Sequence, residues 1–358
     1  MHYLIRLTLL LFLAPIASLS AANITWSETD GYQSDEIELS GLLPEEIGQV
    51  LNLMNSGRKL EEKKRYKKAL KRFKKVTKKY PKSQYAPEAY NRIAQISLKR
   101  NKLDDAFEAF QSIAWVYPNY GSFNDTIGEM YKIAMARLTT YRVKIFGVIP
   151  GFLNKDRAIK YFEQIVYIAP YGDYAPLSLM NVANTWDKMG NDQMAIYALN
   201  RLVVNYPNSL LTPDAYLKLA ESYSDQVNGP HYDQRANEEA MTYFQDFLYQ
   251  YPEDNQVARA EVGLEEAENV LAMSKMKIAD FYYFKRNRYE AAQILYNEAI
   301  TIAPRSQSAD IARSRLSELD EKIASVEAKK EEISEEEANE AMQKKAEKRA
   351  KRKILGIF

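Results

Sequence analysis

One block of sequence recurs six times along this chain and constrains its fold more than any other feature. In each copy an alanine lies twelve positions before a proline, and a large apolar residue stands four positions after the alanine. The alanines are Ala69, Ala106, Ala158, Ala195, Ala240 and Ala292. Their apolar partners are Phe73, Phe110, Phe162, Leu199, Phe244 and Tyr296. Residues four apart share one helical face, so each block predicts a helix that packs closely on a neighbour and stops at its proline.

This order of alanine, aromatic residue and proline resembles the second helix of the tetratricopeptide repeat (TPR), a helix-turn-helix unit of about 34 residues. Prolines near the expected starts of first helices, at Pro87, Pro176 and Pro213, fit the same pattern. We therefore predict an all-α chain that forms a right-handed TPR superhelix over residues 44–316, with about six repeats. Residues 141–156 and 224–238 are expected as insertions. Glycine and proline, at 13 residues each, are too scarce for a turn-rich β fold.

The amino-terminal segment has the pattern of a secretory signal peptide, with Arg6 before a short apolar run and small residues at its end. We expect a signal peptide over residues 1–22, a flexible leader over 23–43 and a charged helical tail over 317–358. The chain contains no cysteine, which excludes disulfides and thiolate metal sites and, on this interpretation, lipoprotein processing. The expected product is exported and is either soluble or peripherally attached to a membrane.

The sequence contains few residues or motifs that could take part in catalysis. His231 is the only histidine outside the expected signal peptide, and a solvated loop position explains it better than a catalytic role. Nucleotide-binding, nucleophile-elbow and zinc-protease motifs are missing. We predict no enzyme activity, no metal and no cofactor; a hydrolase regulated by the repeats is the weakest alternative.

Charge is informative only locally, because the net charge is +1. Residues 58–82 contain fourteen Lys or Arg and two Glu, interleaved with an apolar stripe. The stripe favours the solvated face of a repeat helix. An anionic lipid or acidic protein surface stays open as an alternative, and nucleic acid is disfavoured by export.

If the helices follow TPR register, the first helices turn a set of polar residues toward a groove. These are Asn91, Gln95, Lys99, Asn184, Asp187 and Lys188. Their amides and charges are suited to holding an extended peptide or a terminal carboxylate. Ordinary solvent-facing positions are the alternative interpretation.

The run from Tyr249 to Tyr296 resembles the BamD family, TPR subunits of the machinery that inserts β-barrel proteins into outer membranes. The matching residues are Phe281, Tyr282, Tyr283, Lys285, Arg286, Tyr289, Ala291 and Ala292, while Asn287 replaces a glycine and Leu295 an arginine. The resemblance implies a scaffold that binds a β-barrel assembly component and unfolded outer-membrane chains. It also implies a protein-binding surface at Tyr282, Tyr283, Lys285 and Arg286, with core packing of the tyrosines as the alternative. A general periplasmic TPR adaptor in peptidoglycan or polysaccharide assembly is the alternative function.

The carboxyl-terminal end combines a basic cluster with a short apolar segment. Its expected membrane-contacting residues are Lys351, Arg352, Lys353, Ile354, Leu355, Ile357 and Phe358. Positive charge and apolar burial both favour attachment to an anionic membrane surface. A disordered tail is the alternative.

Overall fold

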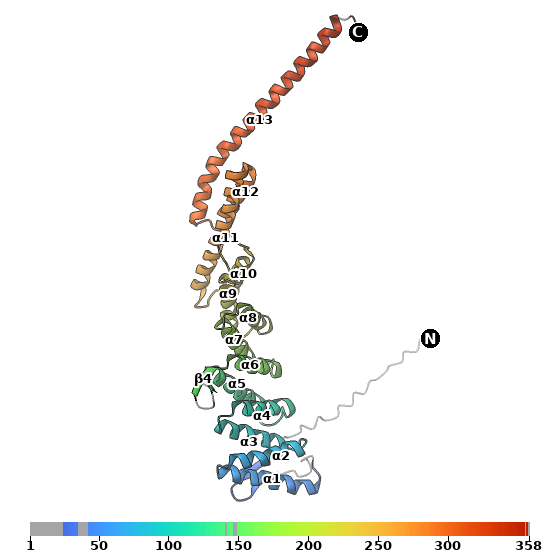
Figure 1. Ribbon diagram of the computed structural model, residues 1–358, viewed down its shortest axis with the longest axis vertical. Coiled ribbons are helices and arrows are strands. Elements are labelled where there is room, and N and C mark those ends of the chain that lie inside the picture. The colour runs from blue at the N-terminus through green and yellow to red at the C-terminus, as the bar shows by residue number, and fades with distance from the viewer. Residues whose placement is uncertain (1–23, 35–41, 140–141, 146–148, 355, 357–358) are drawn as a thin grey trace, which may run out of the picture. The chain divides into compact units, whose positions relative to one another are not determined.

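The computed structural model describes residues 24–34, 42–139, 142–145, 149–354 and 356 (Figure 1). Within these residues the chain is helical apart from two short antiparallel hairpins. The predicted signal peptide at residues 1–22 lies outside the described residues. The chain divides into two compact units, Met1–Asn181 and Val182–Phe358, with the boundary inside helix α7.

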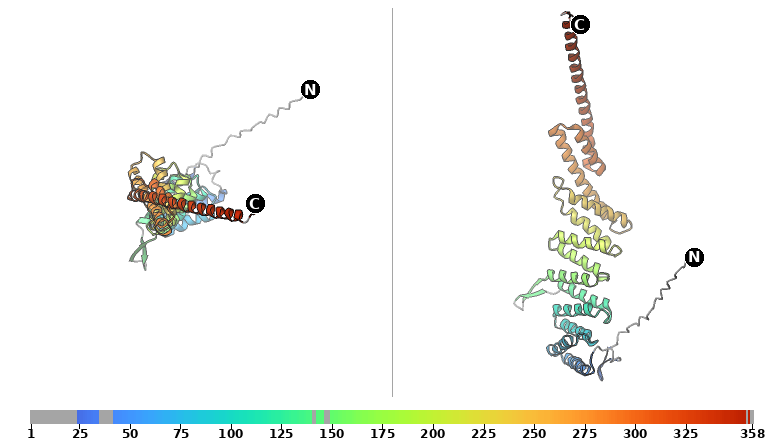
Figure 2. Two further views of the ribbon diagram at one scale, coloured as in Figure 1. Left: turned by 90° about the horizontal axis from the view of Figure 1, so that it is seen from above. Right: turned by 90° about the vertical axis from the view of Figure 1, so that its right-hand side faces the viewer.

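The first unit contains both hairpins. Its elements are β1 (Ile24–Ser27), β2 (Gly31–Ser34), α1 (Pro44–Glu62), α2 (Tyr66–Lys79), α3 (Tyr85–Lys99), α4 (Leu103–Val116), α5 (Phe123–Thr139), β3 (Arg142–Ile145), β4 (Ile149–Leu153), α6 (Lys155–Ile168) and the start of α7 (Tyr174–Asp187). The second unit continues from α7 through α8 (Asp192–Asn205), α9 (Thr212–Ser224), α10 (Arg235–Gln250), α11 (Val257–Arg286), α12 (Tyr289–Ile302) and α13 (Gln307–Ile354). In chain order, α1 to α12 supply the alternating first and second helices of six TPR motifs among the described residues. Figure 2 shows the ribbon from two further directions.

The repeated alanines and their apolar partners lie in the core of these pairs, as predicted. All six alanines are at most 1% exposed, and their partners four residues later are at most 3% exposed. Each second helix also ends two residues before its proline, for example α6 at Ile168 before Pro170. The residue before a proline is pushed out of the helical region, which explains this stop. The predicted all-α TPR fold is confirmed.

The two expected insertions have different structures. In the first, β3 and β4 pair as a hairpin between α5 and α6. In the second, a loop joins α9 to α10 and holds His231, which is exposed and contacts Lys277. The lysines and arginines of α2 are exposed while Ala69, Phe73 and Val76 are buried. This is the arrangement of a solvated helix face.

The structure describes parts of the expected leader and of the expected helical tail. Residues 24–34 form the β1–β2 hairpin, which packs on α1 and buries Tyr32 to 3% exposure, so this part of the expected flexible leader is ordered by tertiary contact. The expected tail from residue 317 belongs to α13, which is one helix from Gln307 to Ile354. Its first turns bury Ala309, Ala312 and Leu319. Residues 327–351 of α13 are exposed.

Candidate protein-binding site

The first predicted groove residues lie on α3 in the first unit. Asn91 and Gln95 are half-buried, and Lys99 is exposed. The Lys99 Nζ atom lies 2.9 Å from Oε1 of Glu61 on α1, whose side chain is only 5% exposed. Lys99 therefore neutralises a buried carboxylate on α1.

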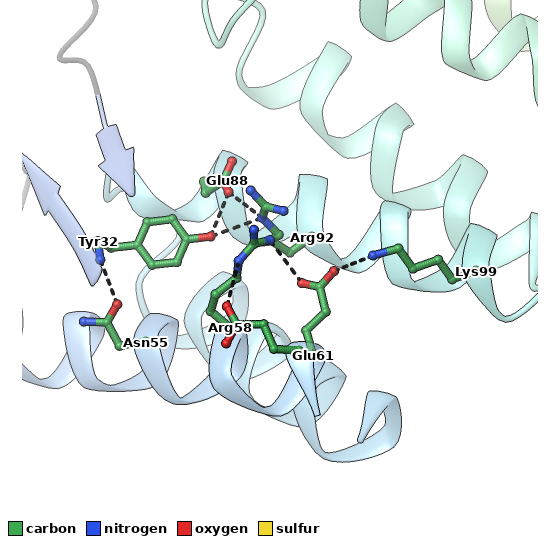
Figure 3. Close-up of polar contacts among 8 residues, drawn as sticks. Tyr32, Asn55, Arg58, Glu61, Glu88, Arg92 and Lys99 are labelled. Carbon is green, nitrogen blue, oxygen red and sulfur yellow. Dashed lines mark hydrogen bonds and ion pairs between the residues drawn. The ribbon is translucent and has the colours of Figure 1, made fainter. Parts of the chain in front are cut away.

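A second charge pair lies on α3 near its start. Arg92 Nε donates to Glu88 Oε1 over 2.7 Å, and the Tyr120 hydroxyl donates to Oε2 of the same carboxylate. Burial raises the pKa of Tyr120, and the Glu88 charge raises it further, so this phenol remains a hydrogen-bond donor. We call the side chains of Asn55, Arg58, Glu61, Glu88, Arg92 and Lys99 the α1–α3 polar cluster (Figure 3).

Tyr32 of the amino-terminal hairpin completes this cluster and is not among the predicted site residues. Its hydroxyl donates to Glu88 Oε1 over 2.9 Å and accepts from Arg92 Nε over 3.1 Å. Its backbone N–H donates to Asn55 Oδ1 over 2.8 Å. A local signal was present, because an Asp-Gly pair at Asp30 and Gly31 between two aromatic residues is a hairpin pattern.

The second set of predicted groove residues lies near the end of α7. Asn184 and Asp187 line a hollow of about 120 Å³ together with Lys218, Glu221 and Asp225 on or beside α9. Lys188 is exposed and is not among the lining residues of this hollow. The structure thus brings two of the three residues to one polar hollow in the second unit.

The residues of the predicted surface at the end of α11 differ in exposure, because successive residues of a helix point in different directions. Tyr283 is 3% exposed and packs in the core with Tyr289 and Tyr296, so its assignment as a surface residue is replaced by core packing. Tyr282 is half-buried, whereas Lys285 and Arg286 are exposed. Asn287 ends the helix at φ +51°, a left-handed conformation that asparagine tolerates better than most residues. The glycine that Asn287 replaces is therefore not required for this turn.

Two exposed phenylalanines join the basic residues at this end of α11. Phe281 is 46% exposed with the Arg286 guanidinium 5.4 Å from its ring centre. Phe284 is 53% exposed and lies under Arg315 of α13 at 4.9 Å. The Phe281, Phe284, Lys285 and Arg286 side chains form what we call the α11 end surface. Aromatic and arginine side chains of this kind are enriched at protein interfaces.

The predicted membrane-contacting end begins on α13. Lys351 is exposed on this helix, and Arg352, Lys353 and Ile354 form its last turn. Leu355, Ile357 and Phe358 lie outside the described residues. Among the helices that the structure describes, none combines the length and apolar character needed to cross a membrane.

Comparisons with known proteins agree with this architecture. Residues 52–83, which cover the second part of α1 and all of α2, match a tetratricopeptide-repeat family model. The chain is therefore a TPR protein by its helix pairs and by this match.

Residues 153–333, about half of the chain, match the family model YfiO, described as outer membrane lipoprotein. The chain belongs to this family. The match runs from the end of β4 through α12 into α13, and it includes the α11 end surface.

Two curated relatives are outer membrane protein assembly factors BamD. The chain is 25% identical to that of Caulobacter vibrioides over 36% of its own length and 42% of the relative. It is 24% identical to that of Xylella fastidiosa over 40% of its own length and 53% of the relative. The chain thus matches about half the length of these relatives. A solved thermophilic TPR protein of Thermus thermophilus is 18% identical, with a TM-score of 0.28 over 60% of this chain and 98% of that one.

Proposed function

We propose that this protein is an exported, non-catalytic TPR scaffold in the assembly of outer-membrane β-barrel proteins. The family match over residues 153–333 is the observation that carries this proposal. The names of the two relatives, which are assembly factors, support it. The exposed aromatic and basic side chains at the end of α11 supply a surface suited to a protein partner.

The proposed partners are a β-barrel assembly component and unfolded outer-membrane chains. The proposed location is the periplasm, peripheral to the outer membrane. Co-purification from solubilised envelopes tests the function directly: recovery of outer-membrane assembly proteins is the expected result. Recovery of peptidoglycan or polysaccharide enzymes in their place would overturn it.

The α11 end surface yields the first mutational prediction. Lys285→Glu with Arg286→Glu should reduce partner recovery several-fold, because both side chains are exposed and reversal turns attraction into repulsion. The melting temperature should stay near that of the wild type, since neither side chain is buried. Lys67→Glu with Lys68→Glu, on the exposed face of α2, changes the net charge equally and is the matched control. Equal recovery with both double variants would remove the α11 end surface from the proposal.

The tail yields the second prediction, that the carboxyl-terminal segment attaches the scaffold reversibly to membrane. Its positive charges, at about 1 kcal/mol each near an anionic surface, are Lys344, Lys345, Lys348, Arg349, Lys351, Arg352 and Lys353. Deletion of residues 344–358 should shift the protein from membrane to soluble fractions. Raised salt should partly mimic the deletion, because it screens charge.

Replacing these seven basic residues with glutamine is the matched variant, since it keeps the apolar end and the length of the chain. This variant should lose as much membrane attachment as raised salt removes, and no more. A truncated protein that still sediments fully with membranes would show that partner binding alone holds the scaffold there.

A further inference from the structure

The β1–β2 hairpin occupies the α1–α3 polar cluster as a bound peptide would. Tyr32 inserts its ring between α1 and α3, where it is 3% exposed, and its hydroxyl meets both members of the Glu88–Arg92 pair (Figure 3). Its backbone N–H donates to the side chain of Asn55, and the guanidinium of Arg58 lies 4.4 Å from the ring centre of Trp26. The cluster thus contacts the hairpin through its backbone and two aromatic side chains.

The side chains of the cluster also make polar contacts that do not involve Tyr32. Arg92 holds one oxygen of Glu88, and Tyr120 holds the other. Glu61 is held by Lys99 from α3. The Glu61–Lys99 pair joins α1 to α3, the Glu88–Arg92 pair lies within α3, and Tyr120 follows α4. Because these contacts lie within the repeat helices and the segment after α4, the cluster is a pre-formed acceptor for a phenol hydroxyl rather than a surface shaped by the hairpin.

The hairpin, in contrast, depends on the cluster for its order. Its two strands have four residues each and pair only with one another in the described chain. Two-stranded hairpins of this size are marginally stable in water by themselves. Gly31, at φ +76°, brings the backbone so near α1 that an added Cβ would lie 2.6 Å from Asn55 Oδ1. A short segment held at one site by side-chain contacts is suited to release and exchange.

We propose that the α1–α3 polar cluster is a binding site for an extended peptide strand bearing a tyrosine, and that residues 24–34 occupy it as an exchangeable ligand within the same chain. A phenol satisfies the site because it donates to Glu88 and accepts from Arg92 at the same time. A phenylalanine would fill the ring position and leave both groups without that partner. This assignment stands on the geometry of the first unit and does not depend on the proposed role in outer-membrane assembly.

A labelled peptide of the chain's own hairpin, ITWSETDGYQS, provides the probe. Fluorescence anisotropy should show little binding to the intact chain, because the tethered hairpin acts at an effective concentration near the millimolar range. Tyr32→Ala should raise the affinity for the peptide by about tenfold or more, since it removes the competing side chain. The same peptide with phenylalanine at the tyrosine position should bind the variant more weakly.

Gly31→Val is a second variant, designed to weaken docking of the hairpin while leaving Tyr32 and the groove side chains unchanged, because valine is strained at φ +76° and its Cβ would meet Asn55. It should raise peptide affinity as Tyr32→Ala does. Gln33→Ala, at an exposed position of β2, should bind as the intact chain does. Adding Asn55→Ala to Tyr32→Ala should weaken the peptide again, since the backbone acceptor is lost.

The proposal is overturned if the peptide binds the intact chain and the Tyr32→Ala and Gly31→Val chains equally, or binds none of them while their circular-dichroism spectra remain helical. Neither outcome would affect the proposed function, which rests on residues 153–333. Loss of partner recovery from envelopes, conversely, would leave the peptide result unchanged.

Discussion

Replacing Ala158 with glutamate is expected to lower the free energy of unfolding by several kcal/mol. Ala158 is fully buried on α6, which packs against α5 in the first unit. A glutamate there must either bury a charge without a partner or push the two helices apart, and both are costly. Thermal and urea unfolding followed by circular dichroism measure the change.

Lys160→Glu is the matched control for this substitution. Lys160 lies on the same helix and is exposed, so the same new side chain remains in water. Its effect should stay within about 0.5 kcal/mol. An Ala158→Glu chain that melts like the wild type, or a spectrum with substantial β content, would mean that the repeat packing is wrong.

The second large effect is expected at Gly263, a helical glycine of α11. A Cβ added to Gly263 would lie 2.3 Å from Cζ of the Phe244 ring, which is itself 2% exposed on α10. The ring packs in the core between α9, α10 and α11, so a shift large enough to admit the Cβ would disturb that packing. Gly263→Ala should therefore destabilise the chain by about 1–3 kcal/mol, and Gly263→Val by more.

Gly48 on α1 is the matched position with the opposite expected sign. A Cβ added to Gly48 meets nothing within 4 Å. Gly48→Ala should stabilise the chain by about 0.5–1 kcal/mol, since alanine loses less backbone entropy than glycine in a helix. The two unfolding midpoints should move in opposite directions; a stabilising Gly263→Ala would contradict the close packing of α11 on Phe244.

The position of each second helix and the face that it buries could be predicted from the sequence. Ala158, Phe162 and Pro170 illustrate why, because the first two lie one turn apart on a helix and the proline stops that helix. These are local properties of the backbone, and the six copies repeat them. The sequence also indicated where one helix pair ends and the next begins, because each proline of the repeated block marks the end of a second helix.

Exposure at the end of α11 required the tertiary structure. Tyr282 and Tyr283 are adjacent and chemically identical, yet α12 and α13 cover the second and leave part of the first exposed. The family resemblance marked both residues without distinguishing them. Only the position of the covering helices decides which neighbour enters the core.

The sequence by itself determined the six helix pairs of this protein, because each pair is marked by residues one helical turn apart. It did not determine which segment of the chain packs against α1 and α3. The bond between Tyr32 and Glu88 joins residues far apart in the chain, and the hairpin pattern at Asp30 and Gly31 says nothing about where the hairpin docks. The tertiary structure decided that contact, because it depends on how α1 and α3 place Asn55, Glu88 and Arg92 around one ring.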